Sequence, residues 1–117
     1  VVGHTGTGKT QMLNSYCNDI FSENYEQTIG SDFFTFTGKF GQKKVQLQFW
    51  DLCGDSNYVE VRNEFYKDVQ LCLIVTDVTN QQSFDGIDMW LREVSKNGGE
   101  KLPTVIVGNK SDLTSQR

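Results

Sequence analysis

The chain has 117 residues, a formal net charge of −4 and 37% hydrophobic residues, which describes one domain over residues 1–117 rather than two. Its longest apolar run, Leu71 to Val75, is much shorter than the roughly 18 residues of a membrane span, so we expect a soluble protein without one. No block of Lys and Arg occurs, which disfavours nucleic acid and a polybasic membrane patch. Cys17, Cys53 and Cys72 form no Cys-x-x-Cys pair, so we expect neither disulfides nor zinc. That cysteine usage favours an intracellular, reducing compartment, cytoplasmic or nuclear.

Helical periodicity and strand alternation follow each other in the first half of the chain. Apolar residues at helical spacing predict a helix over Lys9 to Phe21. Alternation predicts a strand over Asp32 to Phe40, with its phenylalanines on one face, and a second strand over Val45 to Trp50. Because a turn at Gly41-Gln42 leads from the first strand into the second, the two strands should form a hairpin.

The second half alternates helices with apolar strands. A short helix is expected within Tyr58 to Lys67, and the continuous apolar run within Val69 to Val78 is typical of a central parallel strand. Ser83 is expected to cap a helix that ends at Gly98-Gly99. The apolar stripe of that helix is Phe84, Ile87, Trp90, Leu91 and Val94. Thr104 to Val107 should be another buried strand.

The alternation of strands with helices predicts an α/β fold of the doubly wound type, with a mostly parallel sheet and one antiparallel edge hairpin. Val1-Val2 reads as the end of a buried strand that runs into a glycine turn, and Ser111 to Arg117 reads as a polar loop. We therefore expect a domain that is truncated at both ends.

Residues 3–10 read Gly-His-Thr-Gly-Thr-Gly-Lys-Thr and satisfy the pattern G-x-x-x-x-G-K-[ST] between a strand end and a helix start. In that setting, backbone N–H groups curl around phosphates and the helix N-terminus adds its positive dipole end. Lys9 can reach the β- and γ-phosphates, and the Thr10 hydroxyl can bind Mg²⁺. A chance glycine turn is the alternative, and the loop alone leaves ATP, GTP, kinases, ATPases and switches open.

A second polar loop, Asn109-Lys110-Ser111-Asp112, follows the last strand at the sheet edge where doubly wound folds bind ligands. The Asp112 carboxylate can accept hydrogen bonds from N1–H and the 2-amino group of guanine, a donor pair that adenine lacks. Taken alone, such a loop is more often a solvated helix cap. The upstream phosphate loop reverses that preference. Asp51 and Gly54 follow another strand, which puts a carboxylate near Mg²⁺ and an N–H near the γ-phosphate.

With these motifs, the chain resembles the Ras superfamily of small GTPases, and within it the Rab group, over essentially all 117 residues. The resemblance makes Thr28 the switch I threonine that senses Mg²⁺ and the γ-phosphate, with Tyr25 in the same segment. Phe21 falls where the family stacks an aromatic ring on guanine, although it could instead be a core residue that closes the first helix. Phe33 and Trp50 match aromatic positions through which Rab proteins meet effectors.

The resemblance implies GTP or GDP and Mg²⁺ as cofactors, and effector and exchange proteins as partners through switch I and switch II. It also implies roles in signal transduction and vesicle trafficking. The nucleotide-binding residues that it implies are Thr5, Gly6, Thr7, Gly8, Lys9, Thr10, Gln11, Phe21, Tyr25, Thr28, Gly54, Asn109, Lys110 and Asp112. The metal residues are Thr10, Thr28 and, through water, Asp51. The residues for hydrolysis are Lys9, Thr28, Gly54 and Asp55.

A closer resemblance comes from Glu60 to Asp68 and Ser83 to Leu91, which look like the Rab-like GTPases of the RBJ or RJL group. Members of that group often carry a C-terminal J domain, which would recruit an Hsp70-type chaperone. No J domain is visible in residues 1–117. The family's last guanine-contacting loop, Ser-Ala-Lys, and its final helix are also absent from this stretch. Membrane attachment is undecided, because a prenylation cysteine would lie after Arg117.

The sequence departs from the family at Asp55, where most Ras and Rab proteins have the glutamine that orients the attacking water. An ionised aspartate is shorter, accepts only, and is repelled by the triphosphate, so hydrolysis should be slow. The opposing reading makes Asp55 a general base. His4, the only histidine, is expected to be a loop residue rather than a catalytic base.

Two functional classes follow. The first is a GTPase that cycles, in which GTP orders Thr28 and Gly54 and effectors bind until hydrolysis. The second is a GTP-dependent scaffold that stays loaded, which Asp55 favours. A P-loop kinase or ATPase is disfavoured by Asp112 and by the lack of an Arg-bearing lid segment.

Overall fold

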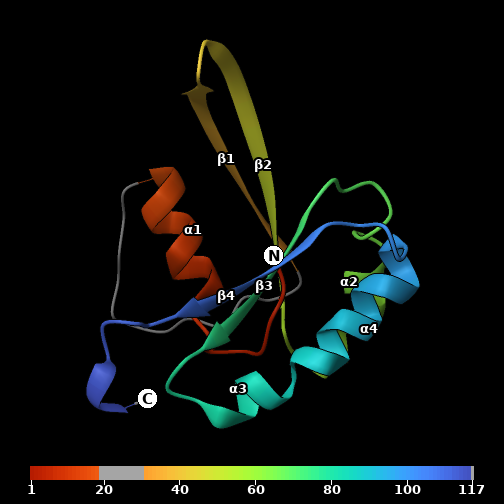
Figure 1. Cartoon of the computed structure of the whole chain (residues 1–117). Helices are drawn as coiled ribbons and strands as arrows, with labels where there is room; N and C mark the ends of the chain where they lie inside the picture. Colours follow the sequence, from red (N-terminus) through yellow and green to blue (C-terminus); the bar gives the residue numbers. More distant parts are fainter. Residues whose placement is uncertain (19–30, 117) are drawn as a thin grey trace.

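The computed structural model describes residues 1–18 and 31–116 (Figure 1). Four strands, four α-helices and two 3-10 turns lie in these ranges. In chain order they are α1 Lys9–Asn18, β1 Ser31–Phe40, β2 Lys43–Leu52, η1 Ser56–Tyr58, α2 Val59–Asn63, β3 Cys72–Asp77, α3 Gln81–Asp85, α4 Ile87–Gly98, β4 Thr104–Asn109 and η2 Thr114–Gln116. The predicted end of the first helix at Phe21 lies outside the described residues.

β1 and β2 form the predicted antiparallel hairpin, which extends away from the rest of the molecule in Figure 1. The pairing runs without a break from Ser31 opposite Leu52 to Phe40 opposite Lys43. Gly41 has φ 66°, a left-handed conformation that glycine adopts without steric cost, so the turn can close. Of the expected apolar face of β1, Phe34 is buried, whereas Phe40 at the tip is 54% exposed.

A second, parallel pair is formed by β3 and β4, with Cys72 opposite Thr104 and Asp77 opposite Asn109. Val1 and Val2 lie between the two pairs of strands. Val2 N–H donates to Leu73 O and Val2 O accepts from Val75 N–H, both at 2.8 Å, while Leu52 N–H donates to Val1 O at 3.1 Å. The result is the predicted α/β architecture, in which β3 is the central parallel strand.

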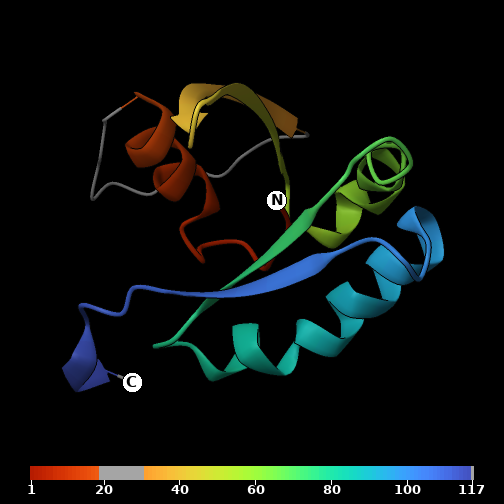
Figure 2. The same cartoon turned by 45° about the horizontal axis from the view of Figure 1, so that its top comes forward.

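The core lies between this sheet and α4. In Figure 2, α3 and α4 run along one side of the β3–β4 pair, and α1 lies on the other side with the hairpin. The buried cluster joins residues from five separate segments of the chain. Its members are Val2, Leu52, Tyr66, Cys72, Ile74, Trp90 and Val94. Among the described residues, no helix is long and apolar enough to cross a membrane.

The single helix expected after Ser83 is wrong in two respects. The structure has two helices, α3 and α4, which meet at Gly86. The N-cap is Asn80, whose side chain accepts a hydrogen bond from Ser83 N–H. Ser83 is buried inside α3, where its hydroxyl also contacts the carbonyl oxygen of Asp77 at 3.1 Å. The C-terminal glycine is confirmed, because Gly99 has φ 91°.

Burial also differs from expectation on three elements. Within the described part of the chain, Val105 and Ile106 of β4 are 47% and 49% exposed, so this strand is not buried there. Phe84, from the expected stripe, is 60% exposed. On α2, the helical spacing of Tyr58, Val61 and Phe65 in the sequence predicts that Val61 is buried, but Val61 is exposed. The buried residue is Arg62, which the periodicity of apolar residues could not indicate.

Candidate functional site

The phosphate-loop sequence occupies the turn between Val2 and α1. Gly6 and Gly8 have φ 79° and 91°, so the backbone curls through conformations that disfavour side chains. A Cβ on Gly8 would lie 2.5 Å from Asn109 Nδ2. The turn therefore favours glycine at position 8, and a side chain there would also displace the Asn109 amide from its present position.

Lys9 is buried at the start of α1. Its Nζ donates to the carbonyl oxygens of Gly3 and His4, each at 3.0 Å. Burial lowers the pKa of Lys9, and the nearby Asp51 carboxylate opposes that change. An ammonium held among carbonyl oxygens in a buried loop is stabilised by an added anion, so the arrangement suits a phosphate.

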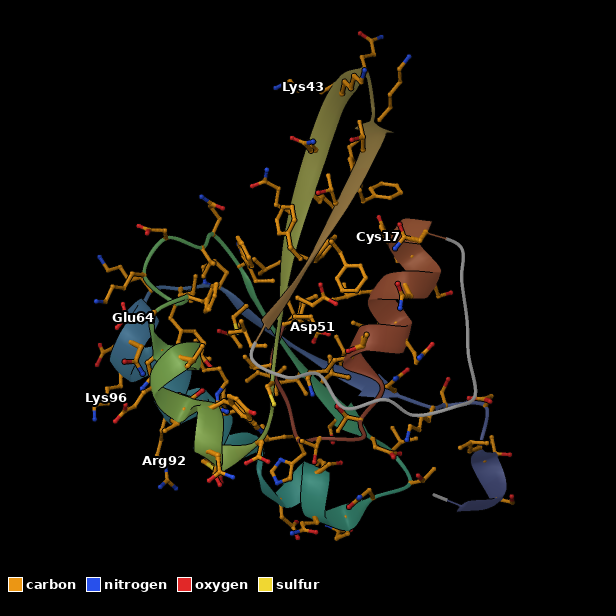
Figure 3. The ribbon with its side chains drawn as sticks, turned by 180° about the vertical axis from the view of Figure 1, so that it is seen from behind. Cys17, Lys43, Asp51, Glu64, Arg92 and Lys96 are labelled. Atoms are coloured by element: carbon orange, nitrogen blue, oxygen red, sulfur yellow. The ribbon has the colours of Figure 1, made fainter. Side chains whose placement is uncertain are left out.

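Thr10 and Asp51 meet beside the loop. Thr10 Oγ1 donates a hydrogen bond to Asp51 Oδ2, and Asp51 is fully buried. Figure 3 shows Asp51 at the base of the hairpin beside α1. A hydroxyl and a carboxylate are hard oxygen ligands of the kind that Mg²⁺ prefers, so these two residues fit the expected metal. In the described ranges, no cluster of three or more His, Cys, Asp or Glu side chains could hold a metal alone.

The loop after β4 contacts the phosphate loop directly. Asn109 Nδ2 donates to Thr7 O at 2.9 Å, and Lys110 Nζ donates to Gly6 O at 2.8 Å. Lys110 has φ 64°, a strained conformation for a residue with a side chain, with a cost of about 1 kcal/mol or more. Two motifs about a hundred residues apart therefore form one structure.

Asp77 was missed by the sequence analysis. It lies at the carboxyl end of β3, and its Oδ2 forms an ion pair with Lys110 Nζ at 2.8 Å. Burial would raise the pKa of Asp77, but hydrogen bonds from Lys110 and Thr79 outweigh that effect and lower it. The signal that could have found it is its position, a carboxylate at the end of an apolar parallel strand.

Asp112 lies beyond Lys110 on the same loop and is exposed. An exposed carboxylate at this edge of the sheet is accessible to the hydrogen-bond donors of a ligand. Thr7 is buried and donates from Oγ1 to His4 O at 2.9 Å, whereas Thr5 is exposed and Gln11 is half-buried. Phe21, Tyr25 and Thr28, expected to contact the nucleotide, lie outside the described residues.

Gly54 packs tightly against the phosphate loop. A Cβ at this position would lie 2.2 Å from Gly3 O and 2.9 Å from Thr5 N, so the backbone approaches as closely as only glycine allows. Asp55 follows, and its Oδ1 accepts from Asn57 N–H at 2.9 Å, which caps η1. Gly54 therefore lies directly against the phosphate loop, whereas Asp55 contacts its own segment and Arg62.

A row of three aromatic rings runs from the hairpin to the segment after α2, in which Phe33 and Trp50 are exposed and Phe65 is partly buried against the core. The ring centroids of Phe33 and Trp50 are 4.6 Å apart, and those of Trp50 and Phe65 are 5.1 Å apart. The sequence indicates Phe33 and Trp50 as effector-contacting positions, but it places Phe65 only within the short helix expected over Tyr58 to Lys67. Its place in the row depends on tertiary packing, which its own segment does not encode.

A cavity of about 360 Å³ lies between β2 and the segment that leads into β3, lined by residues such as Leu47, Phe49, Val69 and Leu71. None of the phosphate-loop or residue 109–112 side chains lines it. We assign the site to the two loops rather than to this cavity, because the loops bring together the backbone donors, the cation and the carboxylates.

Comparison with known proteins identifies the class to which this fold and site correspond. Residues 1–117, the whole chain, match the Ras family. The chain therefore belongs to the Ras family, and its α/β architecture is that of the Ras-like G domain.

Its relatives include Rab-type proteins. The chain is 36% identical over 121 residues to the Ypt/Rab-type GTPase ypt7 of Schizosaccharomyces pombe. It is 35% identical to each of the Ras-related proteins Rab-7b and Rab-7a of Paramecium octaurelia. Each alignment covers 100% of this chain and 59% of the relative, so the chain spans less than two thirds of these curated relatives.

Proposed function

We propose that this chain is the nucleotide-binding part of a Rab-like molecular switch that binds GTP or GDP with Mg²⁺. The observation that carries the proposal is the junction of the two loops, in which Asn109 and Lys110 donate to the carbonyl oxygens of Thr7 and Gly6. That junction supports a single ligand that spans a phosphate site and the exposed carboxylate of Asp112. A guanine nucleotide has the required phosphates and the two base donors.

Each part of the site has a role in this proposal. The loop amides of residues 5–10 and Lys9 bind the phosphates, and the glycine N–H at position 54 contacts the γ-phosphate. Thr10 and Asp51 hold Mg²⁺, Asp51 through water, with Thr28 as the third metal residue. When bound, Mg²⁺ would neutralise phosphate charge. Phe21 and Tyr25 complete the nucleotide contacts.

The GTPase activity proposed for this chain is slow hydrolysis to GDP and phosphate. Asp55 at the position of the usual glutamine supports slow turnover, because a carboxylate cannot donate toward the developing charge on the γ-phosphate oxygens. The second candidate function follows from the same residue. It is a scaffold that stays loaded with GTP and releases partners mainly through nucleotide exchange.

The partner surface proposed for the switch is the aromatic row of Phe33, Trp50 and Phe65 together with switch I and switch II. The side chains of Phe33 and Trp50 are 43% and 38% exposed, which suits docking of an effector or exchange protein. Assignment to the RBJ or RJL group, with a J domain and an Hsp70-type partner, rests on the resemblance of residues 60–68 and 83–91. Signalling and vesicle trafficking are proposed on the similarity to Rab-type relatives.

The direct test of the base assignment is Asp112→Asn. The amide can donate where the carboxylate accepted, so preference should move from GTP toward XTP, whose 2-oxo group needs a donor. A change of at least about tenfold in the ratio of the two dissociation constants is expected, which corresponds to about 1.4 kcal/mol. The measurement is the displacement of a bound fluorescent nucleoside diphosphate from the protein by GTP and, separately, by XTP. A variant that keeps the wild-type ratio would show that Asp112 does not contact the base.

A further inference from the structure

Arg62 of α2 is a buried arginine that bonds in two directions. It is 3% exposed. Its Nε and Nη2 donate to Glu93 Oε2 and Oε1 at 2.9 and 2.7 Å, a bidentate ion pair with α4. Its Nη1 donates to the carbonyl oxygens of Cys53 and Asp55, both at 2.9 Å. One side chain therefore connects α4 to the backbone on both sides of Gly54.

Stability alone is a poor explanation for this arrangement. The desolvation of two buried charges can exceed their attraction, and apolar residues often replace such pairs without loss of stability. Burial acts to lower the pKa of Arg62, but its hydrogen bonds and ion pair with Glu93 outweigh burial and raise it, so the cation persists. The fork instead fixes two particular carbonyl groups, and the peptide between them is the one that approaches the phosphate loop.

Further contacts hold the arginine in its orientation. The Tyr66 hydroxyl donates to Glu93 Oε2, which fixes the carboxylate. The guanidinium carbon lies 4.6 Å from the centre of the Trp90 ring. Trp90 Nε1 in turn donates to His4 Nδ1 at 3.2 Å, so α4 also contacts the phosphate loop itself.

These contacts close a ring that is independent of any ligand. It runs from the phosphate loop at His4 through Trp90 to Arg62, and from Arg62 through Gly54 back to the phosphate loop at Gly3 and Thr5. A backbone N–H held in place before a ligand arrives needs no reorganisation when charge must be bound. The ring is therefore suited to keep the Gly54 peptide ready for a third phosphate.

We propose that Arg62 is a positioning residue that fixes the Gly54 peptide against the phosphate loop and so sets the preference for a nucleoside triphosphate over a diphosphate. This inference rests on the proposed function. A diphosphate has no group at the γ position, so its binding does not depend on where the Gly54 N–H lies. Loosening residues 53–55 should therefore weaken triphosphate binding selectively.

The test uses Arg62→Lys and Arg62→Met in the purified protein, with Arg92→Met as the matched control. Lysine keeps the charge beside Glu93 but lacks the planar fork that serves two directions at once. Arg92 is the neighbour of Glu93 on α4, is exposed, and points outward in Figure 3. The readout is the dissociation rate of fluorescent GDP and of a non-hydrolysable fluorescent GTP analogue in Mg²⁺.

We expect both Arg62 variants to release the GTP analogue about tenfold faster, because the hydrogen bond from Gly54 N–H to the charged γ-phosphate would be weakened and such bonds are strong. GDP lacks that phosphate, so its release should change less than about twofold. Arg92→Met should match the wild type for both nucleotides. Equal acceleration of both rates would reduce Arg62 to a structural role, and no change in either rate would also overturn the inference. Wild-type protein that binds neither nucleotide would instead sink the proposed function.

A measurement on the wild type keeps the inference testable if both Arg62 variants fail to fold. NMR order parameters of the Gly54 and Asp55 N–H vectors in the GDP-bound protein report whether the segment is held in place without a third phosphate, whatever acceptors those groups have. Values comparable to those of α4, about 0.85, are expected. Values below about 0.6, typical of a flexible backbone, would contradict a segment that is already positioned.

Discussion

Asp55 has a structural contact in addition to its proposed role in hydrolysis. Its carboxylate accepts from Asn57 N–H and caps η1, and its carbonyl oxygen accepts from Arg62. A side chain bonded to its own backbone two residues on is a local cap, a frequent use of aspartate. The residue that departs from the family pattern is thus also one that fixes the local backbone.

Asp55→Gln should speed hydrolysis of bound GTP in single-turnover measurements by at least about tenfold, because a neutral amide both accepts from water and donates to the γ-phosphate. The same variant should lower the free energy of unfolding by about 1 kcal/mol, because glutamine caps poorly. Asp55→Asn is the matched control, since it removes the charge and keeps the capping oxygen. Slower hydrolysis in both variants would support the general-base reading and contradict a switch that is held mainly on.

At the scale of single residues, the members of the motifs could be assigned to the site from the sequence, but the residues that they contact could not. The pattern of residues 3–10 identifies Lys9 and Thr10, because the motif is local. Asp77 and Arg62 belong to no motif and enter the structure through contacts with Lys110 and Glu93, which lie more than thirty residues away in the sequence. Such pairs become visible only when the chain is folded.

At the scale of elements, the phosphate loop and α4 are joined by the Trp90–His4 hydrogen bond. A Cβ on Gly86 would lie 2.2 Å from His4 Cε1, so the histidine ring packs against the junction of α3 and α4. Burial, together with the neighbouring Lys9 ammonium, lowers the pKa of His4 below its ordinary 6.5. Neutral His4 accepts at Nδ1, and the protonated ring cannot.

The free energy of unfolding should therefore fall as the pH is lowered below about 6.5, because the unfolded chain binds the proton more readily than the folded one. Above that pH the contribution of His4 is fully present. The measurement is urea denaturation between about pH 7.5 and pH 5.5 of the wild type and of His4→Gln, whose oxygen can still accept from Trp90. The wild type should lose more stability than the variant over this range. Parallel curves for the two proteins would refute the role given to His4.

Elements with a strict period were predicted well, and those set by packing were not. The alternation of apolar and polar residues predicted the hairpin and its turn, because the register of two paired strands is fixed when one face of them is apolar. The stripe through Phe84 and Trp90 is continuous in the sequence, so it concealed the break at Gly86 and the Asn80 cap. Exposure of β4 depends on which elements cover it, and a strand's own sequence does not contain that information.

At the scale of the whole molecule, the site depends on topology. The carboxyl ends of Val1–Val2, β3 and β4 point toward one edge, because these strands are parallel, and each contributes residues there. The doubly wound architecture could be predicted from the alternation of strands and helices. The close contact of Gly8 with Asn109 could not, because it is fixed by how the strands pair.

The central claim is that this edge binds a guanine nucleotide, and the most direct measurement is the melting temperature of the wild type with Mg²⁺ and GDP, GTP or ATP at equal concentrations. A ligand that binds only the folded state adds RT ln(1 + [L]/Kd), about 4 kcal/mol at a thousandfold excess over Kd. We expect a large upward shift with GDP and GTP and none with ATP. An equal shift with ATP, or no shift with any of the three, would contradict the account.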